Sequence, residues 1–412
     1  MRSTRAAGRR VVVTGLGAVT SVGIGAEEFL AALRAGRHGI KPIQAFDTRG
    51  FAHANGCEVA DFDPGPWVRR HAVDELGRAT QFSVAAARMA VDDAGLSADR
   101  LRELTGLVAV GSTDGESRDL DRLVEAQVDG RDERIDPMVV RRIPPSRLSV
   151  CVARELGLTD VEAVTIPTAC AAGNYAIGYG ADAVRGGEAE FAVVGGSDAV
   201  CRKTFAGFYR VGTIAPECCQ PFDLNRQGLL TGEGAGMLLL ESRDAALARG
   251  ARIYAEVLGY GLNCDADHPV APNLDSVARC MRLAHSNAGV RPEEIDFISA
   301  HGTGTKANDV TEAAAIRRVF GDRAPCTIST KAMIGHTMGA ASALAAIACA
   351  LAITHQFIPP TVNHERTDPE CGLDCVPNVA REATVRVVQN NALAFGGNNA
   401  VLILARHAEA AA

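Results

Sequence analysis

The chain has 412 residues, of which 47% are hydrophobic and 22% charged, and its formal net charge is −7. This length suits two packed halves or two domains better than one simple core, and the composition excludes an intrinsically disordered chain. A net negative charge gives no general attraction to nucleic acid or to an anionic membrane, so neither is expected as a partner.

The 12 cysteines follow no disulfide or metal-binding pattern. The closest pairs, Cys218–Cys219 and Cys371/Cys375, lack C-x-x-C spacing and an accompanying histidine pair, so no metal site is expected. Scattered thiols indicate a reducing, cytoplasmic location. The basic run RSTRAAGRR imitates a signal peptide, but the VVVTG that follows predicts a first strand, and no transmembrane helix is expected.

Predicted strands and helices alternate along the chain, which favours an α/β fold with buried sheets. Before Gly250, the expected strands are RVVVTG, LVAVGS, AVTIPT, FAVVGG and GMLLLES, and the expected helices are SVAAARMAVDDAG and NYAIGYGADAVRGG. After Gly250, the expected strands are RIYAEVLGYG, IDFISAHGTG and CTISTK, and the expected helices are SVARCMRLAHSNAG, TEAAAIRRVFG and AASALAAIACALAI. A terminal hairpin, NNALAFGGNNAVLILA, closes the chain, and residues 130–145 and 262–276 are expected to be loops.

The two parts of the chain resemble each other. In each, a strand leads into a helix of small residues and two further strands close the unit. This pattern predicts a duplicated α/β unit with halves at residues 1–255 and 256–412. The alanine-rich segment 341–352 is best explained by burial between two sheets, because small side chains let such layers approach closely.

Cys170 occupies a distinctive place, since TIPTAC ends a strand and AAGNY begins a helix. The unpaired N–H groups at a helix start favour a thiolate. By itself this position is equally consistent with a nucleophile and with a structural thiol, because free cysteines are commonly buried.

Other reactive side chains also stand where strands end. His301 lies in the glycine turn SAHGTGTKANDVTE with Thr303 and Thr305, and Lys331 precedes His336 in STKAMIGHTMGAAS. Glu312, on the helix after the His301 turn, is the expected partner of the Lys331 charge. A turn at Phe395, Gly396 and Gly397 is by default a hairpin turn, and a backbone N–H there is a possible oxyanion donor.

The whole chain resembles the elongating β-ketoacyl-acyl-carrier-protein synthases of the thiolase superfamily. The matching pieces, in order, are TAC at 168–170, PFDLNRQGLLTGEGAGMLLLE at 221–241, HGTGTKAND at 301–309 and STKAMIGHTMGAA at 329–341. The resemblance implies a layered α-β-α-β-α fold with two mixed sheets around buried helices. It also implies a decarboxylative Claisen condensation between an acyl group on Cys170 and malonyl-acyl carrier protein.

The resemblance assigns a role to each reactive residue. The two histidines, His301 and His336, stabilise the enolate, while Lys331 and Glu312 hold the local field and geometry. The backbone N–H groups of Cys170 and Phe395 form the oxyanion hole, and Phe395 also gates the acyl-cysteine. The remaining matches are the pantetheine hydroxyls Thr303 and Thr305, the malonyl-loop residues Asp265, His268 and Val270, and Asp114 at the acyl-pocket mouth.

Three departures from the fatty-acid pattern bear on the substrate, and the first is Ala171–Ala172 after the nucleophile, where Thr-Ser or Ser-Ser is usual. Val270 stands where a threonine is expected, and a carboxylate at Asp114 disfavours a long saturated chain because its desolvation is costly. A ketosynthase of a type II polyketide system, including one that builds unsaturated chains, is therefore favoured over a housekeeping fatty-acid synthase II. A thiolase, which needs a second cysteine near the C-terminus, and a non-catalytic chain-length subunit, which lacks the nucleophile, fit less well.

The same resemblance implies the partners. A homodimer, or a heterodimer with a homologous chain-length factor, is expected. No organic cofactor is expected to be bound, because phosphopantetheine arrives on the acyl carrier protein. Carrier proteins are acidic, so a basic rim made of Arg69, Arg70, Arg78 and Arg210 is the expected docking site.

Overall fold

One mixed β-sheet runs through the centre of the protein and consists of two five-stranded halves. The computed structural model describes residues 8–131 and 135–407. From edge to centre, the first half is β6 (Val161–Ile166), β5 (Gly106–Gly111), β7 (Phe191–Asp198), β9 (Gly234–Ser242) and β1 (Val11–Thr20). The second half is β12 (Cys326–Ile328), β11 (Phe297–Ser299), β15 (Val387–Leu393), β16 (Asn398–Ala405) and β10 (Ala255–Cys264).

The two halves share one topology. In each, the outer three strands are parallel to one another, and the fourth and fifth strands are antiparallel to their neighbours. The predicted duplicated α/β unit is therefore confirmed. A short pairing of β1 with β10, in the register Val12 to Glu256 and Val13 to Ala255, joins the halves into one continuous sheet.

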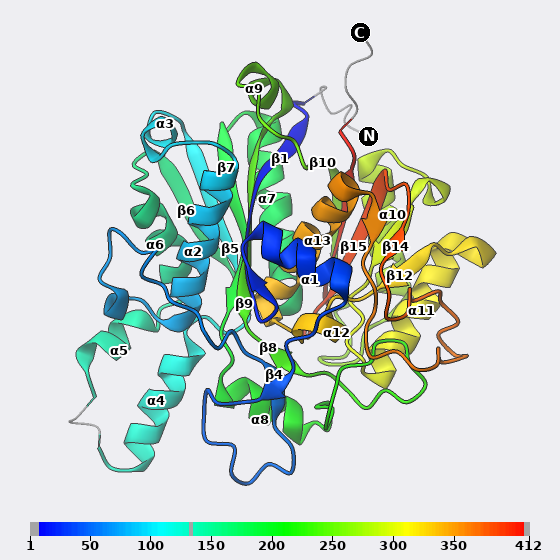
Figure 1. Ribbon diagram of the computed structural model, residues 1–412, viewed down its shortest axis with the longest axis horizontal. Coiled ribbons are helices and arrows are strands. Elements are labelled where there is room, and N and C mark those ends of the chain that lie inside the picture. The colour runs from blue at the N-terminus through cyan, green and yellow to red at the C-terminus, as the bar shows by residue number, and fades with distance from the viewer. Residues whose placement is uncertain (1–7, 132–134, 408–412) are drawn as a thin grey trace.

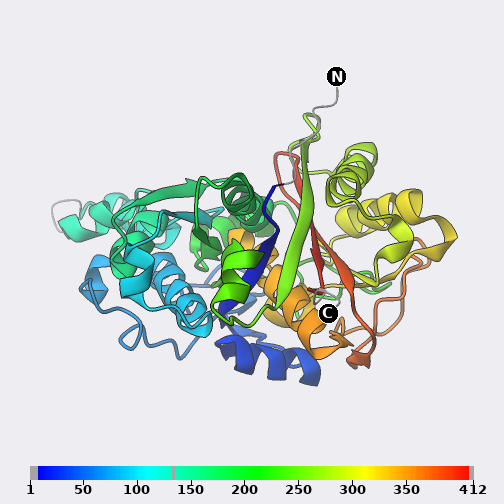
Figure 2. The same cartoon turned by 90° about the horizontal axis from the view of Figure 1, so that it is seen from above.

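Helices form three layers around the two half-sheets (Figures 1 and 2). The outer layer of the first half contains α2 (Arg78–Asp93) and α6 (Arg147–Leu156), and that of the second half contains α10 (Leu274–Ala288) and α11 (Lys306–Phe320). The central layer contains α7 (Ala172–Gly186) and α13 (Ala341–His355), which contact each other and strands of both halves. The expected α-β-α-β-α order is thus confirmed.

The remaining elements connect or cover these layers. The other α-helices are α1 (Ala26–Ala35), α3 (Ala98–Arg102), α4 (Ser117–Val128), α5 (Pro137–Arg142), α8 (Arg202–Arg210), α9 (Arg243–Ala248) and α12 (Lys331–Ile334). The 3₁₀ turns are η1 (Val73–Glu75), η3 (Ala169–Ala171), η4 (Pro292–Glu294), η5 (Gly321–Arg323) and η6 (Met338–Ala340). The short strands are β2 (Gly23–Ile24), β3 (Lys41–Pro42), β4 (Asn55–Cys57), β8 (Thr231–Gly232), β13 (Phe357–Ile358) and β14 (Arg381–Glu382).

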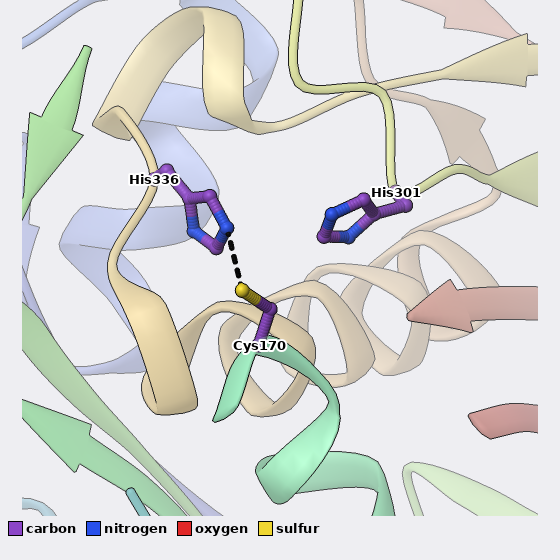
Figure 3. Close-up of side chains that lie close together, drawn as sticks. All are labelled: Cys170, His301 and His336. Atoms are coloured by element: carbon purple, nitrogen blue, oxygen red, sulfur yellow. Dashed lines mark hydrogen bonds between the residues drawn. The ribbon is translucent and has the colours of Figure 1, made fainter. Parts of the chain in front are cut away.

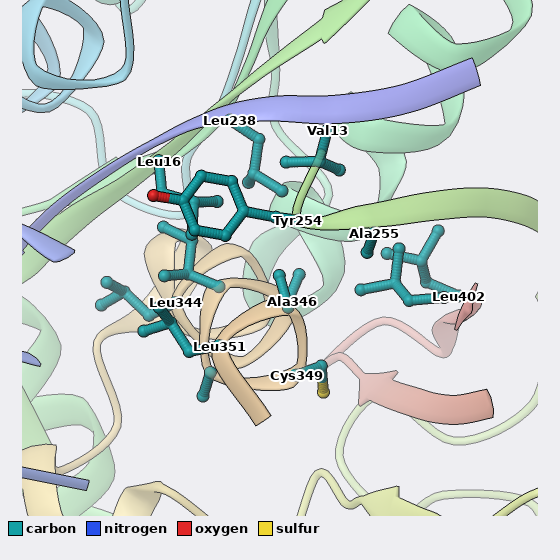
Figure 4. Close-up of a cluster of buried hydrophobic side chains, with 14 of the residues drawn as sticks. Val13, Leu16, Leu238, Tyr254, Ala255, Leu344, Ala346, Cys349, Leu351 and Leu402 are labelled. Carbon is teal, nitrogen blue, oxygen red and sulfur yellow. The ribbon is translucent and has the colours of Figure 1, made fainter. Parts of the chain in front are cut away.

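Helix α13 forms the centre of the hydrophobic core, as its alanine-rich sequence predicts. Leu344, Ala346 and Leu351 pack against side chains of β1, β9 and β10 (Figure 4). The segment Met338–His355 has the length and mean hydropathy, 1.7, of a membrane span, but 89% of it is buried inside the protein. Its apolar character is therefore accounted for by the protein's own core.

The expectation that residues 130–145 and 262–276 are loops needs correction, because β10 extends to Cys264 and α10 begins at Leu274. Residues 130–145 include α5, where the Asp136 side chain accepts a hydrogen bond from the Met138 N–H and Pro137 takes the first helical position. The charged residues of this segment predict a loop, and only Asp136 and Pro137 signal the start of the helix. Residues 132–134 and most of the basic N-terminal run lie outside the described residues.

Candidate active site

Cys170 lies on a sharp turn between the end of β6 and the start of α7. The turn is η3, and Ala169 within it has a φ of 50°, a left-handed conformation that is costly for a residue with a Cβ atom. Behind the turn α7 approaches α13 so closely that a Cβ atom on Gly173 would lie 2.6 Å from the Ala343 nitrogen. Close helix packing therefore fixes the position of the thiol, which is 4% exposed.

The two predicted histidines meet the sulfur of Cys170 (Figure 3). His301 follows β11, His336 follows α12, and Cys170 follows β6, so three segments far apart in the sequence converge. His336 Nε2 lies 3.1 Å from Cys170 Sγ, and the two imidazole rings are 5.5 Å apart. The sulfur and one nitrogen of each ring all lie within 4.8 Å of one another.

Both imidazoles are arranged as neutral N–H donors. The Met338 N–H donates to His336 Nδ1 at 3.2 Å, which leaves the ring proton on Nε2, facing the sulfur. His301 Nδ1 faces the Lys331 ammonium at 3.4 Å, which likewise places the His301 proton on Nε2. Burial, followed by the charge of Lys331, holds the pKa of each histidine well below its ordinary value.

Lys331 and Glu312 are both buried near His301, but they do not form the expected ion pair. Lys331 Nζ donates to the His301 carbonyl at 2.5 Å. The Glu312 carboxylate instead accepts the N–H groups of His301 and Gly302, both at 2.8 Å, and an amide N–H of Asn391 at 3.0 Å. Glu312 therefore fixes the turn that carries His301 and acts on Lys331 only through its charge.

The Cys170 thiol is less acidic than its place at a helix start implies. Burial raises its pKa to about 11, although the Lys331 charge and the backbone N–H groups of Phe395 and Cys170 act in the opposite direction. At neutral pH the resting site therefore holds a thiol. Both N–H groups therefore lie close enough to the sulfur to act on it electrostatically.

This balance predicts how Cys170 reacts with an alkylating agent. Because the thiolate is the nucleophile, the alkylation rate rises about tenfold per pH unit below a pKa of about 11. Lys331→Ala removes a charge that lowers this pKa, so alkylation at pH 8 slows by about tenfold. Lys306→Ala is the control, because Lys306 lines the same cavity but is exposed. Since solvent screens its charge, its removal should leave the alkylation rate of Cys170 within about twofold. Faster alkylation of Cys170 in Lys331→Ala would contradict the conclusion that the Lys331 charge lowers the pKa of Cys170.

Cys170, His301 and His336 face a cavity of about 380 Å³. Thr303 and Thr305 also line it, and their hydroxyl oxygens lie 2.9 Å apart. The structure thus brings the predicted pantetheine-binding hydroxyls to the same cavity as the three reactive side chains.

Phe395 stands at the edge of this cavity in the turn between β15 and β16. It is 39% exposed, and its ring lies 5.4 Å from that of Phe208 on α8, which also lines the cavity. Gly396 and Gly397 have φ values of 85° and 82°, which a side chain would strain. The Gly396 N–H donates to the Pro269 carbonyl at 2.8 Å, so it is not directed toward an oxyanion as the sequence suggested.

Of the three predicted malonyl-loop residues, Val270 lines the cavity. Asp265 shapes its own loop, accepting hydrogen bonds from the Asn273 N–H and the Asn399 amide, and its backbone N–H donates to the Gly397 carbonyl at 2.9 Å. The exposed His268 accepts the N–H groups of Val270 and Ala271. The loop and the Phe395 turn are therefore connected by backbone hydrogen bonds.

Asp114 does not line this cavity, contrary to its expected place at the acyl-pocket mouth. Its buried carboxylate forms an ion pair with Lys203 at 2.8 Å and accepts a hydrogen bond from Thr204 at 2.7 Å. Because these two groups compensate the carboxylate, the predicted desolvation penalty against a saturated chain loses its basis here.

The four arginines predicted to dock the carrier protein differ in whether their side chains are exposed to a partner. Arg69, Arg70 and Arg210 are exposed, and Arg210 ends α8 next to cavity-lining residues. Arg78 instead pairs with Glu233 at 2.9 Å and stacks on the Phe82 ring at 4.6 Å, so it is a structural cation.

Sequence reasoning missed two residues near the site. Phe208, which packs on Phe395, lies in a helix that was not predicted, although the segment Arg202–Arg210 buries Phe205 and Phe208 at helical spacing. Asp198 ends β7, two residues beyond the predicted strand FAVVGG, and a polar residue at that place is a detectable signal.

Comparison with known proteins places this geometry in a family. The sequence matches the model of the beta-ketoacyl synthase N-terminal domain over residues 8–246 and that of the C-terminal domain over residues 254–365. The chain belongs to the β-ketoacyl synthase family. It is accordingly an acyltransferase of the ketosynthase type with the thiolase-like fold, as the sequence motifs predict.

Curated relatives span nearly the whole chain. "Nodulation protein E" from Rhizobium sp. (strain N33) is 40% identical, covering 96% of this chain and 98% of its own. "3-oxoacyl-[acyl-carrier-protein] synthase 2" from Synechocystis sp. is 37% identical, covering 97% and 98%.

Solved structures of ketosynthases superpose closely on this β-ketoacyl synthase. "The ishigamide ketosynthase/chain length factor" is 61% identical with a TM-score of 0.96, covering 98% of this chain and 100% of that one. A type II polyketide ketosynthase in complex with its acyl-carrier protein, AntDE:AntF, is 30% identical with a TM-score of 0.89, covering 97% and 100%.

Proposed function

We propose that this chain is the ketosynthase subunit of a type II polyketide system, with Cys170 as the nucleophile. The convergence of Cys170, His301 and His336 on one cavity carries the proposal. Cys170 takes the acyl group from a carrier-protein thioester. The N–H groups of Cys170 and Phe395 stabilise the oxyanion of the tetrahedral intermediate.

The second half-reaction uses malonyl-acyl carrier protein. Cleavage of the bond to the malonyl carboxylate releases CO₂ and leaves the electron pair as an enolate. The Nε2–H groups of His301 and His336 donate to its oxygen, which needs no strong base. The enolate carbon then attacks the acyl-Cys170 carbonyl, the carbon–sulfur bond breaks, and the thiolate returns.

Each remaining residue supports one of these steps. Lys331 and Glu312 hold the His301 turn, as their contacts indicate. The Thr303 and Thr305 hydroxyls bind the phosphopantetheine arm that delivers the acyl group. Phe395, packed on Phe208, closes the cavity over acyl-Cys170 until malonyl arrives, and Val270 borders the malonyl position.

Sequence identity favours a role in polyketide synthesis over one in fatty-acid synthesis. Identity is 61% to the ishigamide ketosynthase/chain length factor and 37% to the 3-oxoacyl-carrier-protein synthase 2 of Synechocystis. Retention of Cys170 argues against a silent chain-length subunit. Among the described residues lining the cavity, Cys170 is the one thiol, which argues against a thiolase with a second cysteine.

The partners follow from the same comparison and from the free surface of the first half-sheet. β6 is an edge strand, and Val150 and Tyr179 on neighbouring helices are 50% and 41% exposed. A second copy or a homologous chain-length factor covers this edge, as β-strand edges require. An acyl carrier protein docks at Arg69, Arg70 and Arg210.

The proposal has two further parts. The chain divides into its two halves between residues 255 and 256, and the protein is located in the cytoplasm.

A competition experiment tests the pathway. The protein, alone and with a co-expressed chain-length factor, receives equal amounts of saturated and polyunsaturated acyl carriers together with malonyl carrier. Mass spectrometry then quantifies the β-ketoacyl carrier products. We expect condensed product only in the presence of the chain-length factor, as for a ketosynthase/chain length factor pair, whereas extension of the saturated chain by the protein alone would assign it to fatty-acid synthesis.

A further inference from the structure

The turn that carries His336 is strained and is attached to a buried carboxylate. Met338, whose N–H donates to His336 Nδ1, has a φ of 51°, although it is not a glycine. The next residue, Gly339, donates its N–H to Asp198 Oδ2 at 2.6 Å. The bond that sets the His336 tautomer is thus one residue away from the bond to Asp198.

Asp198 is the last residue of β7 and has no exposed surface. Besides Gly339, it accepts hydrogen bonds from the Ser112 hydroxyl at 2.6 Å and from the N–H groups of Thr113 and Asp114 at 2.8 and 3.0 Å. All four partners are neutral donors. A single carboxylate therefore connects the ends of β5 and β7 to the His336 turn.

The packing leaves this turn little freedom. A Cβ atom on Gly339 would lie 2.5 Å from Ser112 Cα and 2.8 Å from Asp198 Oδ2, and one on Gly196 would lie 2.3 Å from the Gly339 carbonyl oxygen. Glycines at both positions let the turn sit directly against the strand ends. Asp198 then fixes it there with a hydrogen bond of 2.6 Å, which is charge-assisted when the carboxylate is ionised; burial raises the pKa of Asp198 to about 7.

We propose that Asp198 is a positioning residue for malonyl decarboxylation: through Gly339 it holds the His336 turn so that the Met338 N–H keeps the His336 proton on Nε2. This inference rests on the proposed role of His336. Glu312 performs the corresponding task for the other histidine, since it holds the backbone of the His301 turn.

Asp198→Asn tests the inference, because the amide has the same shape but loses one acceptor atom. We expect kcat for CO₂ release from malonyl carrier to fall by about 10- to 100-fold, with KM within twofold. Asp198 also acts on Cys170, since its negative charge raises the pKa of that thiol. Alkylation of Cys170 at pH 9 therefore becomes faster by a few-fold, which general loss of structure would not produce.

The charged neighbours of residue 198 and of Cys170 are retained in Asp198→Asn. Asp114, compensated by Lys203, faces Asp198, and Lys331 faces Cys170 together with the two neutral histidines. Ser112→Ala is the matched control, because it removes another donor to the same carboxylate but leaves the Gly339 bond. Its kcat is expected to stay within threefold of the wild type.

The outcomes separate the explanations. Unchanged decarboxylation in Asp198→Asn, an equal loss in Ser112→Ala, or slower Cys170 alkylation in Asp198→Asn would each overturn the positioning role. If Asp198→Asn does not fold, Gly339→Ala displaces the turn while keeping the carboxylate, and it should lower kcat without speeding alkylation; a normal kcat would overturn the inference. His336→Ala is assayed in parallel, since normal decarboxylation there would overturn the proposed function as well.

Discussion

Replacing His336 with alanine is expected to lower CO₂ release from malonyl carrier by about 100- to 1,000-fold, the usual cost of losing one preorganised donor to a developing oxyanion. The donor is the Nε2–H, whose proton the Met338 N–H assigns to that atom. Burial and Lys331 keep the ring neutral, so it donates without acting as an acid. Radiolabelled or coupled CO₂ assays on malonyl carrier measure the loss.

Transfer of an acyl group to Cys170 should suffer less in the same variant, by at most about tenfold. The N–H groups of Cys170 and Phe395, which stabilise that intermediate, are backbone groups and remain in place. His301→Ala should behave similarly, and His336→Asn, which keeps an N–H donor, should recover part of the decarboxylation. A larger loss of acyl transfer than of decarboxylation would reverse the assigned roles.

Replacing Cys170 with alanine is expected to abolish condensation, a loss of more than about 10⁴-fold, because no other group accepts the acyl chain. Decarboxylation should remain within about fivefold of the wild type. Its donors are the two histidines, and removing the sulfur 3.1 Å from His336 Nε2 leaves that N–H free for the enolate oxygen. Condensed product and CO₂ are measured in the same reaction mixture.

Cys151→Ala is the matched control for this variant. Cys151 is likewise a buried thiol of the first half, but it lies on α6 and does not line the cavity. It should retain both half-reactions apart from a modest loss of stability. Parallel loss of decarboxylation and condensation in Cys170→Ala would show that the two steps are not separated as proposed.

Much of the fold was predictable from local sequence patterns. The hydrophobic strands and the Ala-rich helix 341–355 carry strong signals because both are buried on all sides. Strand β11 was overestimated, since only residues 297–299 pair while Ala300 onward forms the His301 turn. Helix α5 was missed because six residues with an Asp–Pro start look like part of a charged loop.

Cys170, His301 and His336 were found because each stands between a predicted strand and the helix that follows it, which is visible in the sequence. What the sequence did not show was their partners. The expected Lys331–Glu312 pair is wrong in detail, since Glu312 binds backbone N–H groups whose direction depends on the His301 turn. Likewise Arg78 reads as a surface cation until the fold brings Glu233 and Phe82 next to it.

Asp114 illustrates the same limit. A carboxylate in the loop after a strand faces a cavity or turns away from it according to backbone angles that one sequence does not reveal. Here Lys203 and Thr204 bind it from α8, 89 and 90 residues later in the chain. Long-range pairs of this kind need the folded chain.

The most direct test of the account is intact-protein mass spectrometry after incubation with an acyl carrier, followed by peptide mapping. We predict that the wild-type protein gains the mass of one acyl group, that the adduct maps to the peptide containing Cys170, and that Cys170→Ala gains none. An adduct on another residue, or equal loading of Cys170→Ala, would contradict the account.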